Sequence, residues 1–165
     1  MNIHYSEKTQ FDLFTIAVSH EDQKEGLKLL NTLIKNSANV NCRGEYGKTP
    51  LIYLMIGTIT TSQIDLTDTR LEYLIKKITL LIQNGADPDI CTFTGRNVVC
   101  LLAIASNLWK GQVTEFTWKT LFNLLVTNKN YNKRDKLGTA LEITGDTVFS
   151  KLFKEYIEEK GFLNI

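Results

Sequence analysis

The feature that most constrains the fold of this 165-residue chain is a turn sequence that occurs three times. The copies occupy residues 37–51, 85–99 and 128–141. Each contains a glycine at a corresponding place, and successive glycines (Gly47, Gly95 and Gly138) are 48 and 43 residues apart. Such repetition is typical of chains that stack similar units, because one unit alone cannot bury its apolar face. We therefore expect a row of stacked units that share a continuous core.

The segments that flank the turns have the apolar periodicity of α-helices. Leu71, Leu74, Ile75 and Ile78, for example, recur at spacings of three, one and three residues. Thr49-Pro50 indicates a helix start, because threonine caps the backbone and proline fits the first helical turn. The predicted helices span residues 10–19, 23–36, 50–59, 69–84, 97–107, 114–127, 140–144 and 146–160. They make one all-α domain over residues 1–165, with four two-helix units at 10–41, 42–89, 90–132 and 133–160.

Composition and motif content argue against catalysis and against bound metals or cofactors. The 19 basic and 18 acidic residues leave a net charge of +1, which gives no bulk attraction to nucleic acid. Two histidines, and three cysteines without a C-x-x-C pair, do not match a zinc site or a disulfide framework. The phosphate-binding glycine loops and the H-E-x-x-H and G-x-S-x-G motifs are absent. We therefore expect a protein that is not an enzyme and holds no cofactor.

The sequence also predicts a location. No basic start followed by an apolar segment resembles a secretory signal, and no apolar run approaches the about 18 residues of a membrane span. We expect a cytoplasmic protein with reduced thiols and no membrane contact.

The turn and helix motifs together resemble the ankyrin repeat, whose pattern is G-x-T-P-L-H-x-A, then a second helix, then G-A-D-x-N. Gly47-Lys48-Thr49-Pro50-Leu51 is similar to the first part of this pattern, and residues 36–41 and 84–89 are similar to the last. The resemblance covers residues 10–158. It implies a solenoid of about four stacked helix-turn-helix units.

The chain departs from this family in two ways. The histidine of the pattern is replaced by Ile52, Cys100 and Glu142. The repeats also exceed the usual 33 residues, and the extra residues fall between paired helices, at 57–68 and 108–116. The apolar residues of these inserts either cover the edge of the stack as a small core or form an exposed patch for a partner. They are Ile64, Leu66, Trp109 and Phe116.

The resemblance implies a monomeric, non-enzymatic module that binds another protein through a concave face and the tips of its turns. The candidate partner-binding residues at the tips are Arg43, Glu45, Tyr46, Lys48, Phe93, Thr94, Arg96, Arg134, Lys136 and Leu137, to which the second insert adds Trp109. We expect Tyr46 and Phe93 to be paired anchors, because aromatic residues are favoured at protein interfaces. The alternative is that one or both pack on the neighbouring turn. The stretch 129–136, with a net charge of +3, either contacts an acidic partner or is a solvated turn.

Such a module acts as an inhibitor or an adaptor. A bacterial immunity protein, an antitoxin-like inhibitor of a toxin, and a bacterial or viral effector in a host cytosol remain open alternatives. A small enzyme and a nucleic-acid binder are disfavoured, the first because His4 and His20 are the only histidines that could activate a cysteine nucleophile.

Overall fold

The computed structural model describes residues 6–60, 68–109 and 111–162, and within them the chain is built from α-helices and one 3-10 helix, without a named strand. The elements are α1 (Glu7–Ser19), α2 (Gln23–Lys35), η1 (Glu45–Gly47), α3 (Pro50–Thr60), α4 (Asp68–Gln83), α5 (Val98–Leu108), α6 (Glu115–Leu125), α7 (Ala140–Thr144) and α8 (Val148–Glu159). The predicted all-α class is confirmed, and every predicted helix is present with ends within three residues of those expected. Most of the first insert, including Ile64 and Leu66, lies outside the described residues.

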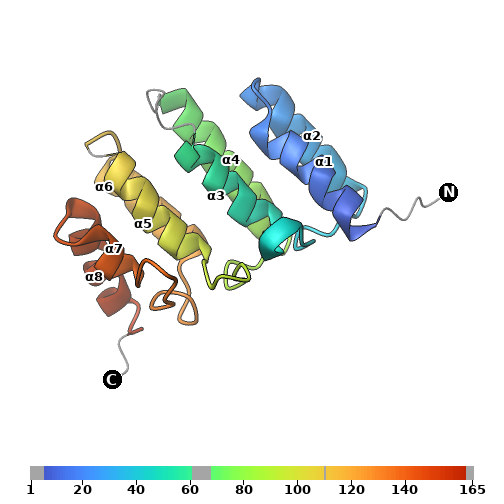
Figure 1. Ribbon diagram of the computed structural model, residues 1–165. Helices are drawn as coiled ribbons and strands as arrows, with labels where there is room; N and C mark the ends of the chain where they lie inside the picture. The colour runs from blue at the N-terminus through green and yellow to red at the C-terminus, as the bar shows by residue number, and fades with distance from the viewer. Residues whose placement is uncertain (1–5, 61–67, 110, 163–165) are drawn as a thin grey trace.

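The helices stand in two rows, which Figure 1 shows from the N-terminal end at the right to the C-terminal end at the left. One row is formed by α1, α3, α5 and α7, each packed on the next, and the other by α2, α4, α6 and α8 in the same way. The segments that lead from one helix pair to the next lie together at the lower edge of this view (Figure 1). The chain therefore forms four helix pairs in sequence order.

Each helix that follows one of the three turns is preceded by a short polar residue that caps its N-terminus. Thr49, Asn97 and Thr139 each accept a hydrogen bond from the backbone N–H three residues later, at 3.3, 2.9 and 3.4 Å. These side chains satisfy one of the N–H groups that a helix leaves unpaired at its N-terminus. The repeated turn thus ends each time on a capping residue, which fixes where α3, α5 and α7 begin.

The turns themselves are closed by backbone hydrogen bonds at matching places. The first and second join Gly44 N–H to Lys48 O at 2.9 Å and Thr92 N–H to Arg96 O at 2.8 Å. The third is one residue shorter and joins Asp135 N–H to Gly138 O at 3.1 Å. The glycine of each turn has a positive φ, of 72°, 82° and 120° in chain order, which glycine adopts without the strain of a Cβ. Because each turn requires a residue with a positive φ at this place, a glycine recurs in each copy.

A cluster of large rings fills the core between α5, α6 and α8. It consists of Trp109, Trp118, Phe122, Phe149, Phe153 and Tyr156. Trp109 is only 2% exposed and stacks on Trp118, with ring centroids 5.9 Å apart. The expectation that Trp109 contributes to a partner-binding surface is therefore wrong: the chain after α5 folds its ring inward. Phe116, from the same insert, is 80% exposed, so the second insert both extends the core and leaves an apolar side chain on the surface.

Candidate functional site

The three turns form one continuous edge of the molecule, which we call the turn edge and define as residues 43–48, 91–96 and 129–137. Each turn exposes one large apolar side chain on this edge. Tyr46 is 66% exposed, Phe93 76% and Leu137 58%. Five other large apolar side chains of the described residues are exposed, Phe116 most of all, but they are scattered over five different helices, whereas the three on the turns lie along one edge. The turn edge is therefore the leading candidate for a functional surface.

The first and second turns are joined directly. The Phe93 N–H donates to Tyr46 O at 2.9 Å, and Arg43 Nη1 donates to Cys91 O at 3.4 Å. The Phe93 ring lies against Gly47, where an added methyl group would come within 2.7 Å of it. Phe93 thus packs on the neighbouring turn with one side and faces water with the other.

The two aromatic residues do not occupy equivalent positions in their turns. Counted back from the turn glycines, Tyr46 corresponds to Thr94, and Phe93 corresponds to Glu45. Tyr46 has a φ of 59°, unusual for a residue with a side chain, and Lys48 Nζ lies 5.3 Å from the centre of its ring. The expected pairing of Tyr46 and Phe93 is therefore corrected to two neighbouring, offset side chains.

An ion pair joins the second and third turns. Arg96 Nε donates to Asp135 Oδ2 at 2.8 Å, and the other carboxylate oxygen of Asp135 accepts from Leu137 N–H at 2.6 Å. The Asp135 side chain is buried, so its charge relies on these partners. Arg96, expected to contact a partner, is thus largely engaged in holding the second turn to the third.

Arg134 is also engaged within the chain. Its Nη1 donates to both carboxylate oxygens of Glu142, at 2.7 and 2.8 Å. Glu142 also accepts from Thr139 N–H at 2.6 Å, and this hydrogen bond, followed by that from Arg134, lowers the pKa of its carboxyl group. Glu142 occupies one of the places where the ankyrin pattern has histidine, and here it links the turn to the helix that follows.

Below the turn edge, polar side chains connect each turn to the next at corresponding positions. Asn41 donates to Gly85 O and accepts from Asp87 N–H, both at 2.8 Å. Asp89, the counterpart of Asn41, accepts a hydrogen bond from the Thr127 hydroxyl group. These bonds hold the three turns at fixed positions relative to one another.

Most of the remaining residues that were predicted to bind a partner are exposed, and the turn edge to which they belong is rich in cations. Arg43, Glu45, Thr94 and Lys136 are exposed, and Lys48 is half-buried. The turn edge holds seven lysine or arginine side chains and two carboxylates, whereas the whole chain has a net charge of only +1. Among the residues that the structure describes, the ion pairs do not include Lys129, Lys133 or Lys136. The third turn therefore presents three cations to solvent.

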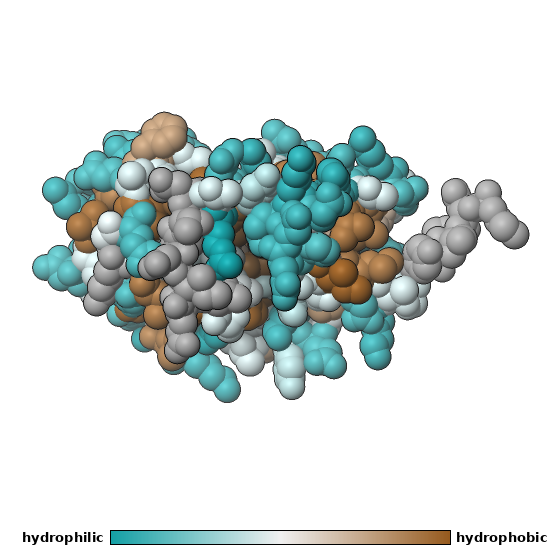
Figure 2. Space-filling view, turned by 90° about the horizontal axis from the view of Figure 1, so that it is seen from above, coloured by the Kyte–Doolittle hydropathy of each residue, from teal (hydrophilic) through white to brown (hydrophobic). Residues whose placement is uncertain are grey.

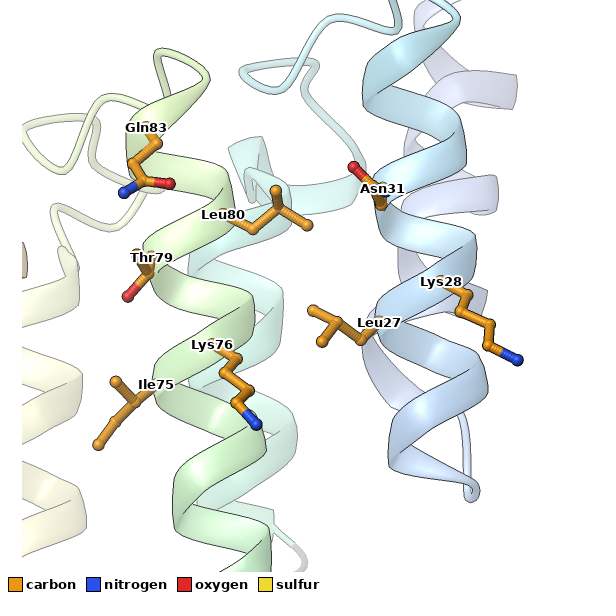
Figure 3. A pocket seen from close by; sticks show the side chains of 8 residues that line it. All are labelled: Leu27, Lys28, Asn31, Ile75, Lys76, Thr79, Leu80 and Gln83. Carbon is orange, nitrogen blue, oxygen red and sulfur yellow. The ribbon is translucent and has the colours of Figure 1, made fainter.

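A second surface feature, not foreseen from the sequence, is a groove of about 470 Å³ between α2 and α4. Leu27 and Leu80 extend into the space between the two helices (Figure 3). Lys28 and Lys76 flank it and pair with glutamates on their own helices. The helical periodicity assigns Leu27 to the apolar face of its helix, but it does not indicate that this face stays half exposed.

Three buried titratable groups lie away from the turn edge or behind it. Lys77 is fully buried, and its Nζ donates to Val18 O at 2.9 Å and to Gln23 Oε1 at 3.0 Å; burial lowers its pKa to about 8. Burial disfavours the charged form of a thiol too, which for cysteine means a raised pKa: about 12 for Cys42 and about 11 for Cys100. Thiols with such pKa values are poor nucleophiles at neutral pH.

The described part of the chain contains no group of three or more His, Cys, Asp or Glu residues arranged to hold a metal ion. Its helices are also too short or too polar to cross a membrane. Seen from the end opposite the turn edge, hydrophilic side chains cover much of the middle of the molecule, and hydrophobic ones show toward both the N-terminal and the C-terminal helices (Figure 2). No protein-family model matches the sequence, and neither does any curated protein.

Proposed function

We propose that the chain is an ankyrin-repeat protein that binds a partner protein along its turn edge, without catalysis, as an inhibitor or an adaptor. The observation that carries this proposal is the row of Tyr46, Phe93 and Leu137, each exposed on a turn whose neighbours hold it in place.

Several repeated features support the ankyrin assignment. Each turn has a closing backbone hydrogen bond, a positive-φ glycine and a polar capping residue, and in the third turn the hydrogen bond spans one residue fewer. Helix pairs that follow one another in sequence also pack side by side in two rows, as in a stack of repeats. Two of the three residues that replace the histidine of the pattern make polar contacts, since Cys100 Sγ donates to Lys133 O at 3.6 Å and Glu142 makes the contacts described above. The third, Ile52, is a buried apolar side chain.

The rigidity of the turn edge supports partner binding there. A surface that is ordered before it meets its partner loses little conformational entropy on binding. The hydrogen bond from Phe93 to Tyr46 and the ion pair from Arg96 to Asp135 supply that order. Exposed aromatic and apolar side chains on such a support are the usual anchors of protein interfaces.

A capture experiment with two matched double variants tests the proposal. The edge variant carries Tyr46→Ala and Leu137→Ala. The control variant carries Ile16→Ala and Val148→Ala, which also remove exposed apolar side chains but lie on α1 and α8. Phe93 and Arg134 are left unchanged, because their contacts with Gly47 and Glu142 would mix binding with stability.

The wild-type chain and the control variant are expected to retain the same protein from an extract of the cells that produce the chain, and the edge variant is expected to lose it. Melting temperatures of both variants should stay within a few degrees of wild type, because exposed positions contribute little to stability. Equal capture by the edge variant and the wild type would refute the proposal.

A further inference from the structure

We infer that the turn edge selects an acidic, extended segment of its partner, with apolar side chains at every third position. This inference rests on the proposed function and adds the chemistry of the partner to it.

The first argument is charge. The turn edge has seven cationic and two anionic side chains, and Glu142, which pairs with Arg134 from just outside this edge, lowers the excess from five to four. The chain as a whole has a net charge of only +1. Of the two carboxylates of the turn edge, that of Asp135 is buried against Arg96, which leaves Glu45 as the one that faces solvent. Lys129, Lys133 and Lys136 are exposed and take no part in the ion pairs of the described residues. An acidic partner complements such an edge, and a basic one is repelled by it.

The second argument is spacing. Packed helices lie about 8–10 Å apart, so the turns of successive helix pairs follow one another at about this distance. A segment in the polyproline II conformation has three residues per turn and a rise of about 3.1 Å, so every third side chain lies on one face, about 9 Å from the next. The spacing of one such face therefore matches that of the turns as units, each of which exposes one apolar side chain. It does not describe the backbones of Tyr46 and Phe93, which are closer because the Phe93 N–H donates to Tyr46 O at 2.9 Å. The three lysines that face solvent all belong to the third turn, so the acidic residues of the segment meet them at that end.

The third argument distinguishes a protein segment from a nucleic acid. Single-stranded nucleic acids bind by stacking bases on open aromatic faces. Here one face of each aromatic ring is already occupied, because Lys48 lies over the Tyr46 ring and one side of the Phe93 ring lies against Gly47. The third apolar side chain, Leu137, is aliphatic and offers no stacking surface. The row suits aliphatic side chains of a peptide better than bases.

Fluorescence anisotropy with defined probes tests this inference. The acidic probe is a labelled peptide of four Leu-Glu-Pro repeats, in which proline favours the extended conformation. A peptide of four Leu-Gln-Pro repeats removes the charge, and a 12-nucleotide oligo-dT keeps negative charge without apolar side chains. The charge-reversed variant carries Lys129→Glu, Lys133→Glu and Lys136→Glu. Its control carries three reversals at exposed lysines of α6 and α8, namely Lys119→Glu, Lys151→Glu and Lys154→Glu.

The acidic peptide is expected to bind best and to bind less tightly as salt is added. The charge-reversed variant should bind it about tenfold more weakly, because each exposed charge contact contributes a fraction of a kcal/mol. The control should bind like wild type. Equal binding of the neutral peptide, tighter binding of oligo-dT, or no binding of the acidic peptide at millimolar concentration would each overturn the inference.

Capture of the natural partner distinguishes a failure of this inference from a failure of the proposed function on which it rests. If the edge variant loses the captured protein while the charge-reversed variant keeps it, the turn edge binds a partner that is not selected by charge, and only the inference fails. If the edge variant keeps the protein, both fail.

Discussion

Replacing Lys77 with methionine tests how the first and second helix pairs are joined. Lys77 lies on α4, yet its ammonium group reaches the end of α1 and the start of α2, where it donates to Val18 O and Gln23 Oε1. Desolvation by burial is the cause of its lowered pKa, without a carboxylate partner to offset it. Methionine keeps the volume of the side chain and removes the charge.

The size and sign of the effect follow from the two pKa values. The pKa of Lys77 falls from 10.5 in the unfolded chain to about 8 in the folded chain. Between these values the unfolded chain holds a proton that the folded chain lacks, so the free energy of unfolding rises with pH over this window. A pKa shift of this size changes the free energy of unfolding by about 3 kcal/mol across the window. This increase in the free energy of unfolding is absent below pH 8, where Lys77 is protonated in the folded and the unfolded chain, and is complete above pH 10.5.

Urea unfolding followed by circular dichroism, at several pH values across this window, measures the effect. The buried thiols of Cys42 and Cys100 act in the opposite direction, because raised thiol pKa values destabilise the fold as pH rises above 9. Their contribution is common to wild type and variant, so the difference between the two isolates Lys77. Lys76→Met, at the neighbouring exposed lysine, serves as the control and should not reproduce the effect. Parallel stability curves for wild type and Lys77→Met would refute the reasoning.

Three further changes test other parts of the structure. Gly47→Ala should destabilise the fold by about 1–2 kcal/mol, because its φ is 72° and the added methyl group meets the Phe93 ring. Gly57→Ala lies inside α3, where the added methyl group meets no atom of the described residues within 4 Å, and should stabilise the fold by about 0.5–1 kcal/mol in the same chemical denaturation assay. Asp135→Ala should lower the free energy of unfolding by about 1–3 kcal/mol, since it removes the buried carboxylate that pairs with the partly exposed Arg96 and accepts from Leu137 N–H. An unchanged melting temperature would contradict this. Cys91, the half-buried thiol, should react first with Ellman's reagent at pH 8 in the folded chain, and all three thiols should react after unfolding; equal rates in the folded chain would argue against the burial of the other two.

Much of the fold follows from local sequence signals. The 3.6-residue periodicity of apolar side chains and the position of each turn glycine locate the helices to within three residues. The capping role of Thr49 follows in the same way, since it is a short polar residue placed directly before an apolar helix. Thr139, a cap not predicted from the sequence, is a residue of the same kind. Each of these features depends on residues close together in the chain, which a single sequence displays directly.

The features that the sequence did not reveal depend on residues distant in the chain. Arg96 and Asp135 are 39 residues apart, and neither has a neighbouring residue that indicates the other as its partner. In the sequence Trp109 is part of an insert, and only its stacking on Trp118 of α6 shows that its ring lies in the core. Sequence alone therefore located the candidate site on the turns but could not separate side chains that hold the turns together from those free to meet a partner.

The ring cluster has a consequence for how the molecule comes apart. In a linear stack, each unit is held by its own contacts and those with its neighbours, so the chain opens first at its weaker end. Six large rings join α5, α6 and α8, whereas the described residues of the first two helix pairs contain one ring pair, Phe11 with Tyr53. Amide hydrogen exchange should therefore be fastest in α1 and α2. The basic third turn lies between α6 and α7, so it keeps its shape during the local openings that release the N-terminal helices.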